Sequence, residues 1–329
     1  MARKLMLVLV LFCVAVSSFS ALRVAVVAND AIGDRGFTDM AYFGIREAGE
    51  DFDIQWRVFE CMNDPSRYYD TLMAAAANFD IIFVNPGYFF DNELSEIMTM
   101  FPEKTYVYID GVASIQGVIS LPFKQNEGAF LAGALAALLT DATALEMIGN
   151  QRTVGFVGGQ DMPVIRDYQK GFEEGVAYVD PEIRIVARYA GTHFDPARGK
   201  ETAYQVNREG ADVIFQAAGP TGLGVLEAAK DYKFYAIGVD TDQGYIQPGF
   251  IVSSMLKRVD VAVWDVVRMA VEGELEKGEV YSYDVANGGI GLAYNDYAMS
   301  IIPAGIYLQL KEIEEKIAAG DIVVGSYLE

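Results

Sequence analysis

Residues 22–28 read LRVAVVA, a short and mainly apolar run, and residues 37–50 read FTDMAYFGIREAGE, a helical pattern. A buried strand followed by a helix is the repeating unit of a parallel sheet that helices cover on both faces. The same alternation continues with strand candidates at Ile54–Phe59, Asp80–Asn85 and Thr105–Asp110. The first third of the chain is therefore predicted to form an α/β lobe.

A second series of the same kind follows. Its strand candidates are Thr153–Val157, Ile183–Tyr189, Asp212–Gln216 and Phe234–Val239. We therefore expect two doubly wound lobes with parallel sheets, one at residues 21–123 plus 251–282 and the other at 124–250 plus 283–329. The second crossing is placed before Phe250–Met255 because that run, with the helix pattern Val259–Gly273, reads as a return to the first lobe. Lobes joined by such a hinge form a cleft that closes on a ligand.

The composition supports two lobes and excludes some partners. At 329 residues the chain exceeds the size at which a single core usually stops growing. Lys and Arg number 25 against 46 Asp and Glu, a formal net charge of −21. So acidic a surface repels nucleic acid and anionic lipid, so no nucleic-acid partner is expected. A neutral solute fits this charge better than a polyphosphate does.

The first twenty residues are predicted to be a signal peptide. Arg3 and Lys4 precede the apolar run Leu5–Val16, which is too short to span a bilayer. The small residues of SFS at 18–20 then place cleavage near Ser20. The protein is thus expected to be exported, to a periplasm or to the outer face of the cytoplasmic membrane.

Cysteine usage leaves two forms of the exported chain open. Cys13 lies inside the apolar run after VLF at 10–12, which is a poor lipobox, so a lipid anchor at Cys13 stays an alternative to a soluble protein. After cleavage only Cys61 remains, so the mature chain has no internal disulfide.

The sequence lacks the residues that most catalytic mechanisms need. His193 is the single histidine, which argues against zinc clusters and against Ser/His or Cys/His catalysis, and no P-loop motif occurs. We therefore expect no enzyme activity, no metal and no cofactor. The sequence GPTGLG at 219–224 is predicted to be a tight turn whose backbone, beginning at Gly219, lines the cleft. Asp240 ends a strand, and its carboxylate either accepts two sugar hydroxyls or caps a helix.

Six blocks of sequence resemble, in order, those of a known family. They are DRGFTD at 34–39, FKQNEGAFLAG at 123–133, GFVGG at 155–159 with PVI at 163–165, AAGPTG at 217–222, IGVDTDQ at 237–243 and SMLKRVD at 254–260. The chain is similar to the basic membrane protein family, the purine nucleoside receptor A-like solute-binding proteins of ABC importers. The resemblance implies a type I periplasmic-binding-protein fold with a purine nucleoside between the lobes. It also implies an ABC permease as partner, and we expect a monomer.

The resemblance also implies site residues. Phe37 matches the first of two aromatic rings that sandwich the base, and Asn29 or Asp30 matches an early polar contact. The other matches are Asp240 and Asp110 to aspartates that hold the ribose and the edge of the base, and Lys257 to a lysine that reaches the ligand.

The second ring is where this chain departs from the family pattern. The family reads Y-x-G-S-[FW]-x-D-P, whereas residues 189–196 read YAGTHFDP. His193 therefore stands at the aromatic position and Phe194 follows it, and one of the two is expected to supply the ring. A changed ring leaves riboflavin, a free base or a pentose open as ligands. A nucleoside hydrolase built on Asp30, Asp34 and Asp240 is the alternative from another class.

Overall fold

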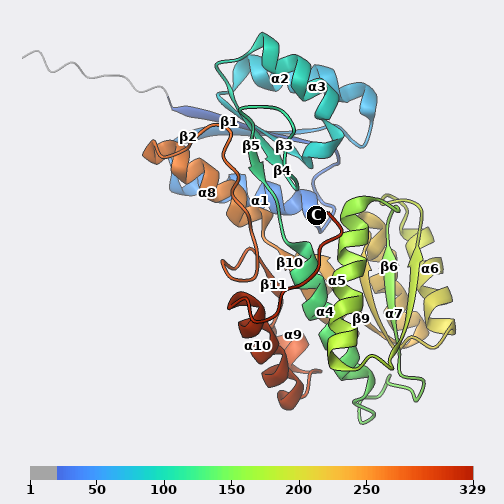
Figure 1. The fold of residues 1–329 in the computed structure, drawn as a ribbon. Coiled ribbons are helices and arrows are strands. Elements are labelled where there is room, and N and C mark those ends of the chain that lie inside the picture. The colour runs from blue at the N-terminus through green and yellow to red at the C-terminus, as the bar shows by residue number, and fades with distance from the viewer. Residues whose placement is uncertain (1–20, 329) are drawn as a thin grey trace, which may run out of the picture.

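The computed structural model describes residues 21–328 and contains two α/β lobes, one above the other, with the end of the chain between them (Figure 1). The first lobe contains the following elements in chain order: β1 (Leu22–Ala28), α1 (Phe37–Asp51), β2 (Ile54–Glu60), α2 (Tyr68–Asn78), β3 (Ile81–Asn85), α3 (Asp91–Met100), β4 (Thr105–Ile109) and β5 (Ile119–Leu121). The helix α8 (Val259–Glu272) returns to this lobe and packs along α1.

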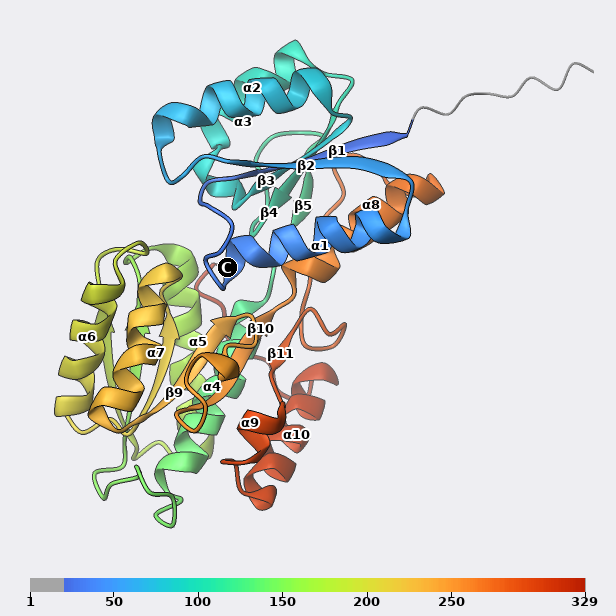
Figure 2. The same ribbon diagram turned by 180° about the vertical axis from the view of Figure 1, so that it is seen from behind.

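The first sheet has the order β2-β1-β3-β4-β5, and its strands are parallel. Alternate residues of β1 face opposite layers, as the pleat of a strand requires. Val24 and Val26 belong to the core that contains α1 and α8, whereas Ala25 and Val27 belong to the core under α2 and α3. Figure 2 shows the two helix pairs on opposite faces of the sheet, with α1 and α8 toward the second lobe.

The second lobe contains the remaining elements: α4 (Gln125–Thr140), β6 (Thr153–Gly158), α5 (Pro163–Val179), β7 (Arg184–Tyr189), α6 (Pro196–Arg208), β8 (Val213–Ala217), α7 (Pro220–Tyr232), β9 (Tyr235–Asp240), β10 (Ile251–Lys257), β11 (Ile290–Leu292), α9 (Asp296–Met299) and α10 (Ala304–Ala318). The sheet order is β11-β10-β9-β8-β6-β7, and β11 is the antiparallel edge strand. Proline at the first turn begins α5, α6 and α7, where its missing N–H costs nothing.

The placement of β10 corrects the expected boundary at residue 251. This strand pairs in parallel with β9 and antiparallel with β11, so it belongs to the second sheet. Six of its seven residues, all except Leu256, are buried, and an apolar run with this pattern fits either sheet equally well. The chain therefore returns to the first lobe after Lys257, not before Ile251.

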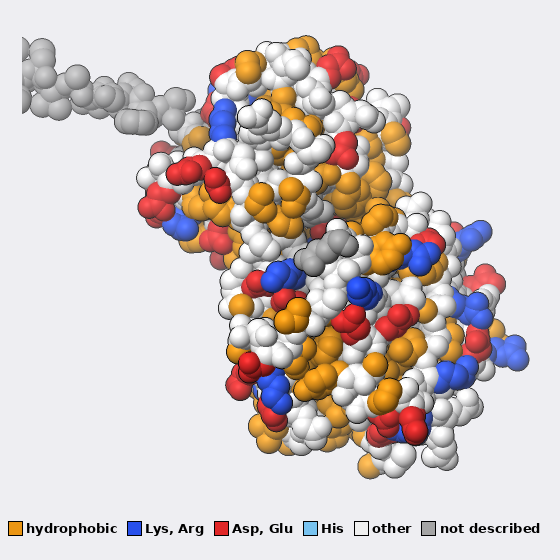
Figure 3. All heavy atoms as spheres, viewed as in Figure 1, with side chains coloured by type: hydrophobic (Ala, Val, Ile, Leu, Met, Phe, Trp, Pro, Cys, Tyr) orange, Lys and Arg blue, Asp and Glu red, His pale blue; other side chains and the backbone are white. Residues whose placement is uncertain are grey.

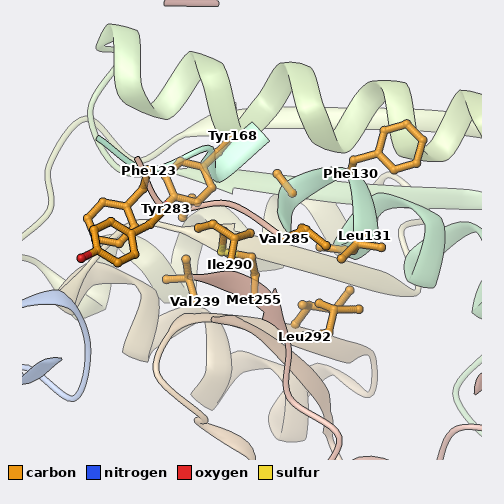
Figure 4. Close-up of a cluster of buried hydrophobic side chains, with 14 of the residues drawn as sticks. Phe123, Phe130, Leu131, Tyr168, Val239, Met255, Tyr283, Val285, Ile290 and Leu292 are labelled. Atoms are coloured by element: carbon orange, nitrogen blue, oxygen red, sulfur yellow. The ribbon is translucent and has the colours of Figure 1, made fainter. Parts of the chain in front are cut away.

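Three crossings join the lobes. The first crossing follows β5, the second follows β10, and the third runs through the segment around Tyr283. Tyr283 forms a β-bridge with Phe123, which lies at the end of the first crossing. The rings of Phe123 and Tyr283 stack with centroids 5.2 Å apart. Figure 4 shows this pair beside Val239, Met255 and Tyr168, so apolar packing continues from the crossings into the second lobe.

Within residues 21–328 no helix is long and apolar enough to cross a membrane. The predicted signal peptide and Cys13 lie outside the described residues. On the face shown in Figure 3, acidic and basic side chains are interspersed over the second lobe, so the negative charge of the chain is not gathered into one patch there.

Candidate functional site

The carboxyl ends of strands from both sheets face one cavity between the lobes. Ligands of open parallel sheets bind at these ends, where loops rather than ladders present side chains. The segments after β1, β3 and β4 line the cavity from the first lobe, and those after β6, β7 and β8, together with the ends of β9 and β10, line it from the second. The structure brings all nine predicted residues together around this cavity: Asn29, Asp30, Phe37, Asp110, His193, Phe194, Gly219, Asp240 and Lys257.

Two aspartates stand at strand ends in an unusual backbone conformation. Asp110 follows β4 with φ of 70°, and Asp240 ends β9 with φ of 66°. Such left-handed geometry costs a residue other than glycine about 1–3 kcal/mol and tends to occur at functional sites. Both side chains are nearly buried and line the cavity. The backbone thus accepts strain at two of the four positions where an aspartate lines the cavity.

Lys257 is the one lysine or arginine among the residues that line the cavity. Its ammonium pairs with Asp110 of the opposite lobe and donates to Gln125 Oε1 at 3.4 Å. The rings of Phe37, Phe123 and Tyr168 surround it, with centroids 5.3, 5.3 and 5.5 Å from Nζ. Aromatic faces attract a cation, so these rings and Asp110 offset the loss of water around a lysine that is only 1% exposed.

Asp240 has no such direct partner. Its pKa is raised to about 7, mainly by burial, with the charge of Lys257 lowering it and the negative charges of Asp34 and Asp110 adding to the rise. Its carboxylate oxygen lies close to the backbone of Gly36 on the first lobe. A buried acceptor of this kind is stabilised by hydroxyl or N–H groups that donate to it.

Aromatic surface comes from both lobes. Phe37 begins α1, and His193 and Phe194 lie in the loop after β7. The imidazole of His193 packs against Gly159, where a Cβ atom would come within 2.3 Å of the ring. Burial lowers the pKa of His193 to about 4, so the ring is neutral at pH 7. A neutral imidazole can stack on a ligand and also form a hydrogen bond.

Asp34 organises the loop that presents Phe37. Its carboxylate accepts the backbone N–H groups of Gly36, Thr38 and Asp39 at 2.8–3.0 Å, which caps the first turn of α1. Burial raises the pKa of Asp34, and these three donors oppose that rise. Asp34 also lines the cavity, whereas the sequence suggests a role for its carboxylate only in a hydrolase.

Tyr88 and Tyr168 also line the cavity and were missed. Tyr88 follows β3 in the short 3₁₀ helix Gly87–Phe89, so the strand-end rule was enough to find it. Tyr168 lies in the second turn of α5 and reads in the sequence as an ordinary core position, so no sequence signal marks it.

The lobes touch directly beside the cavity. The carbonyl oxygen of Arg35 accepts the hydroxyl of Thr241 at 3.0 Å and the side-chain N–H of Gln243 at 2.9 Å. Arg35 has φ of 53°, which turns this carbonyl group toward the second lobe. Gln243 is itself held by Gln216 and by the backbone N–H of Val239. The two lobes therefore lie in a closed arrangement, with direct hydrogen bonds between them.

Among residues 21–328 no group of three or more His, Cys, Asp or Glu side chains is placed to hold a metal ion. The fold and the cavity together define the class of protein: a two-lobed binding protein of the type I periplasmic-binding-protein fold, with its site between the lobes.

Comparison with known proteins places the chain within this class. The family model described as "ABC transporter substrate-binding protein PnrA-like" matches residues 21–326. The chain therefore belongs to the Bmp family of PnrA-like ABC transporter substrate-binding proteins. Proteins of this kind are extracytoplasmic receptors of importers and not enzymes.

Individual relatives agree over nearly the whole chain. Basic membrane protein D of Borreliella burgdorferi (strain JD1) is 31% identical over 327 residues, covering 95% of this chain and 92% of that protein. The ABC transporter nucleoside-binding protein BmpA of Lactococcus lactis subsp. cremoris (strain MG1363) is 28% identical, with 90% and 88% covered. The crystal structure of an ABC transporter solute-binding protein from Aeropyrum pernix K1 superposes with a TM-score of 0.82 at 27% identity, over 92% and 94% of the two chains.

Proposed function

We propose that this protein binds a purine nucleoside between its lobes and delivers it to the transmembrane subunits of an ABC permease. The observation that carries the proposal is the pairing of buried acceptors with aromatic surface in one cavity. Asp110 and Asp240 offer carboxylates, while Phe37 and the His193–Phe194 loop offer rings from opposite lobes. A nucleoside has a flat apolar base to stack and hydroxyl groups to donate.

Charge supports an unphosphorylated ligand. The cavity contains Asp30, Asp34, Asp110 and Asp240 against the single cation Lys257, which is already paired. A phosphate placed among these carboxylates would add repulsion in a poorly solvated site. Nucleosides are therefore favoured over nucleotides. The nucleoside-binding name of the Lactococcus relative points the same way.

A thermal-unfolding panel on residues 21–329 tests the proposal. The ligands are guanosine, inosine, adenosine, cytidine, riboflavin, ribose and adenine, with 2′-deoxyguanosine and guanosine monophosphate as matched controls. A ligand at 100 times its Kd adds about 2.7 kcal/mol of stability, which raises Tm visibly. We expect purine ribonucleosides to give the largest shifts, and the deoxy analogue to bind about tenfold more weakly because it leaves a buried carboxylate short of a donor. Shifts confined to riboflavin or ribose would overturn the nucleoside proposal.

The export of the chain is part of the same proposal. We propose that residues 1–20 are removed as a signal peptide and that the receptor is a monomer. Intact-mass measurement of the exported protein tests this, because cleavage after Ser20 gives an unmodified N-terminus at Ala21. A lipid-modified N-terminus at Cys13 would contradict it.

A further inference from the structure

The last segment of the chain, residues 321–328, runs from α10 to a position between the lobes, against α5 and the start of α4 (Figure 1). The carbonyl groups of Val324 and Gly325 both accept the side-chain amide of Asn126 at 3.2 Å. The N–H of Gly325 donates to Glu174 at 2.8 Å. Both lobes and the cleft are complete without this segment, yet several hydrogen bonds hold it in place.

Two more bonds of this segment end on one buried carboxylate. The hydroxyl of Ser326 and the backbone N–H of Tyr327 both donate to Asp167 Oδ1, at 2.9 and 2.7 Å. The other oxygen, Oδ2, accepts the side-chain amide of Gln125 at 2.5 Å. Asp167 and Gln125 are each 1% exposed. The C-terminal segment therefore fixes a carboxylate that faces inward to α4.

Gln125 also contacts Lys257, which lines the cavity. Its Oε1 accepts from the ammonium of Lys257 at 3.4 Å, and Lys257 pairs with Asp110 across the lobes. A chain of polar contacts thus runs from Ser326 and Tyr327, through Asp167 and Gln125, to Lys257. It joins the end of the polypeptide to the one lysine of the cavity.

Donor and acceptor chemistry gives this chain a direction. An ionised carboxylate only accepts, so Gln125 must turn its NH₂ group to Asp167 and its oxygen to Lys257. If the amide of Gln125 were reversed, its oxygen would face the carboxylate and its NH₂ group would face the ammonium. Both contacts would then be repulsive. Asp167 therefore decides which end of Gln125 meets Lys257.

We propose that the C-terminal segment is a positioning element of the ligand cleft: it fixes Asp167, Asp167 orients Gln125, and Gln125 holds the ammonium of Lys257 against Asp110. None of Gln125, Tyr327 and the N–H groups of the segment lines the cavity. The effect on ligand affinity rests on the proposed function, whereas the effect on Lys257 does not.

The replacement Asp167→Asn tests the direction of the chain. The N–H of Tyr327 can only donate, so the new amide keeps its oxygen toward the segment and turns its nitrogen to Gln125. Gln125 then has to accept, and its NH₂ group faces Lys257. We expect Asp167→Asn to weaken nucleoside binding about tenfold. Adding Gln125→Glu places one acceptor oxygen toward the amide introduced at position 167 and the other toward Lys257, and the double variant has the same net charge as the wild type. It is therefore expected to recover the affinity of the wild type.

A second readout needs no ligand. In protein labelled with ¹⁵N-lysine, the ammonium signal of Lys257 is assigned by its loss in Lys257→Met. We expect that signal to shift in Asp167→Asn and after deletion of residues 323–329, and to return in the double variant. Glu174→Ala, which removes only the Gly325 bond on the same helix, is the matched control and is expected to leave it unchanged.

The outcomes separate the two proposals. A double variant no better than Asp167→Asn, or a Glu174→Ala control that shifts Lys257 as strongly, overturns the positioning role. The expected lysine shifts in a protein that binds no nucleoside uphold the positioning role and overturn the nucleoside proposal. If the protein binds nucleosides but the Lys257 signal does not change in Asp167→Asn, the nucleoside proposal is upheld and the positioning role is overturned.

Discussion

Asp240 is expected to set the pH dependence of the receptor. Burial and the charges of Asp34 and Asp110 raise its pKa to about 7 against the pull of Lys257, whereas an aspartate in an unfolded chain titrates near 3.9. A raised pKa means that the folded state favours the protonated form. The stabilisation is therefore complete at pH values below about 4 and is lost as the pH rises to 7 and above. The ionised carboxylate of Asp240, which a ligand can donate to, therefore lowers the stability of the free protein.

The replacement Asp240→Asn separates these two effects. Ligand hydroxyl groups donate best to the ionised form, so wild-type affinity is expected to fall by up to about tenfold per pH unit below 7. The variant is expected to bind more weakly at pH 8, to show no such slope between pH 6 and 8, and to have a higher Tm than the wild type when free of ligand. Isothermal titration at pH 6, 7 and 8 measures the slope. His193, with a pKa of about 4, does not titrate in this range, so a slope that persists in Asp240→Asn contradicts the assignment.

At the scale of elements, the loop before α1 and the loop after β9 form a contact that exists only when the lobes meet. The hydroxyl of Thr241 donates across the gap to the carbonyl oxygen of Arg35. Thr241→Val removes this bond with little change in shape. Because one such bond contributes about 0.5–1.5 kcal/mol, we expect ligand dissociation to become about two- to tenfold faster while association is unchanged.

The matched control for this loop is Thr202→Val. Its hydroxyl also donates to a backbone carbonyl, that of Arg198, but within α6 and far from the other lobe. Stopped-flow measurements on both variants compare the two positions. Equal rate changes in both would show that Thr241 acts through folding stability and not through closure.

The elements also show what sequence alone predicts. Both sheets were predicted because most of their strands are short apolar runs that a helix follows, a pattern with few alternatives. The partner of β10 was not, because its apolar run carries no information on which sheet it joins. Asp240 was found because it ends a strand, and parallel sheets gather such residues at one edge, whereas Asp110 was expected only from the resemblance of the sequence blocks. Tyr168 and the pair Gln125–Asp167 lie on helix faces, where side chains that reach a cleft look the same as core residues.

At the scale of the whole molecule, three crossings and one cavity make closure the central event. Closure brings Asp240 and the single lysine of the cavity, both in the second lobe, near Asp34 and Asp110 of the first, in a largely buried site. Like charges at short distance in such a medium repel strongly. The closed arrangement is therefore opposed in the free protein and is stabilised when ligand donors satisfy the carboxylates. A ligand shifts the population only by its differential affinity for the closed form.

This balance predicts a ligand-dependent shape. We expect small-angle scattering at pH 8 to give a smaller radius of gyration with a saturating purine nucleoside than without one, because the free lobes separate about the crossings. Asp240→Asn removes one of the repelling charges, so its free form is expected to be more compact than the free wild type and the change on binding smaller. Lys257→Met removes the cation that holds Asp110 and is expected to do the opposite. Scattering profiles that are identical with and without ligand, in a protein shown by calorimetry to bind it, would mean that the lobes stay closed and that ligands enter by local motion of the loops after β1 and β7.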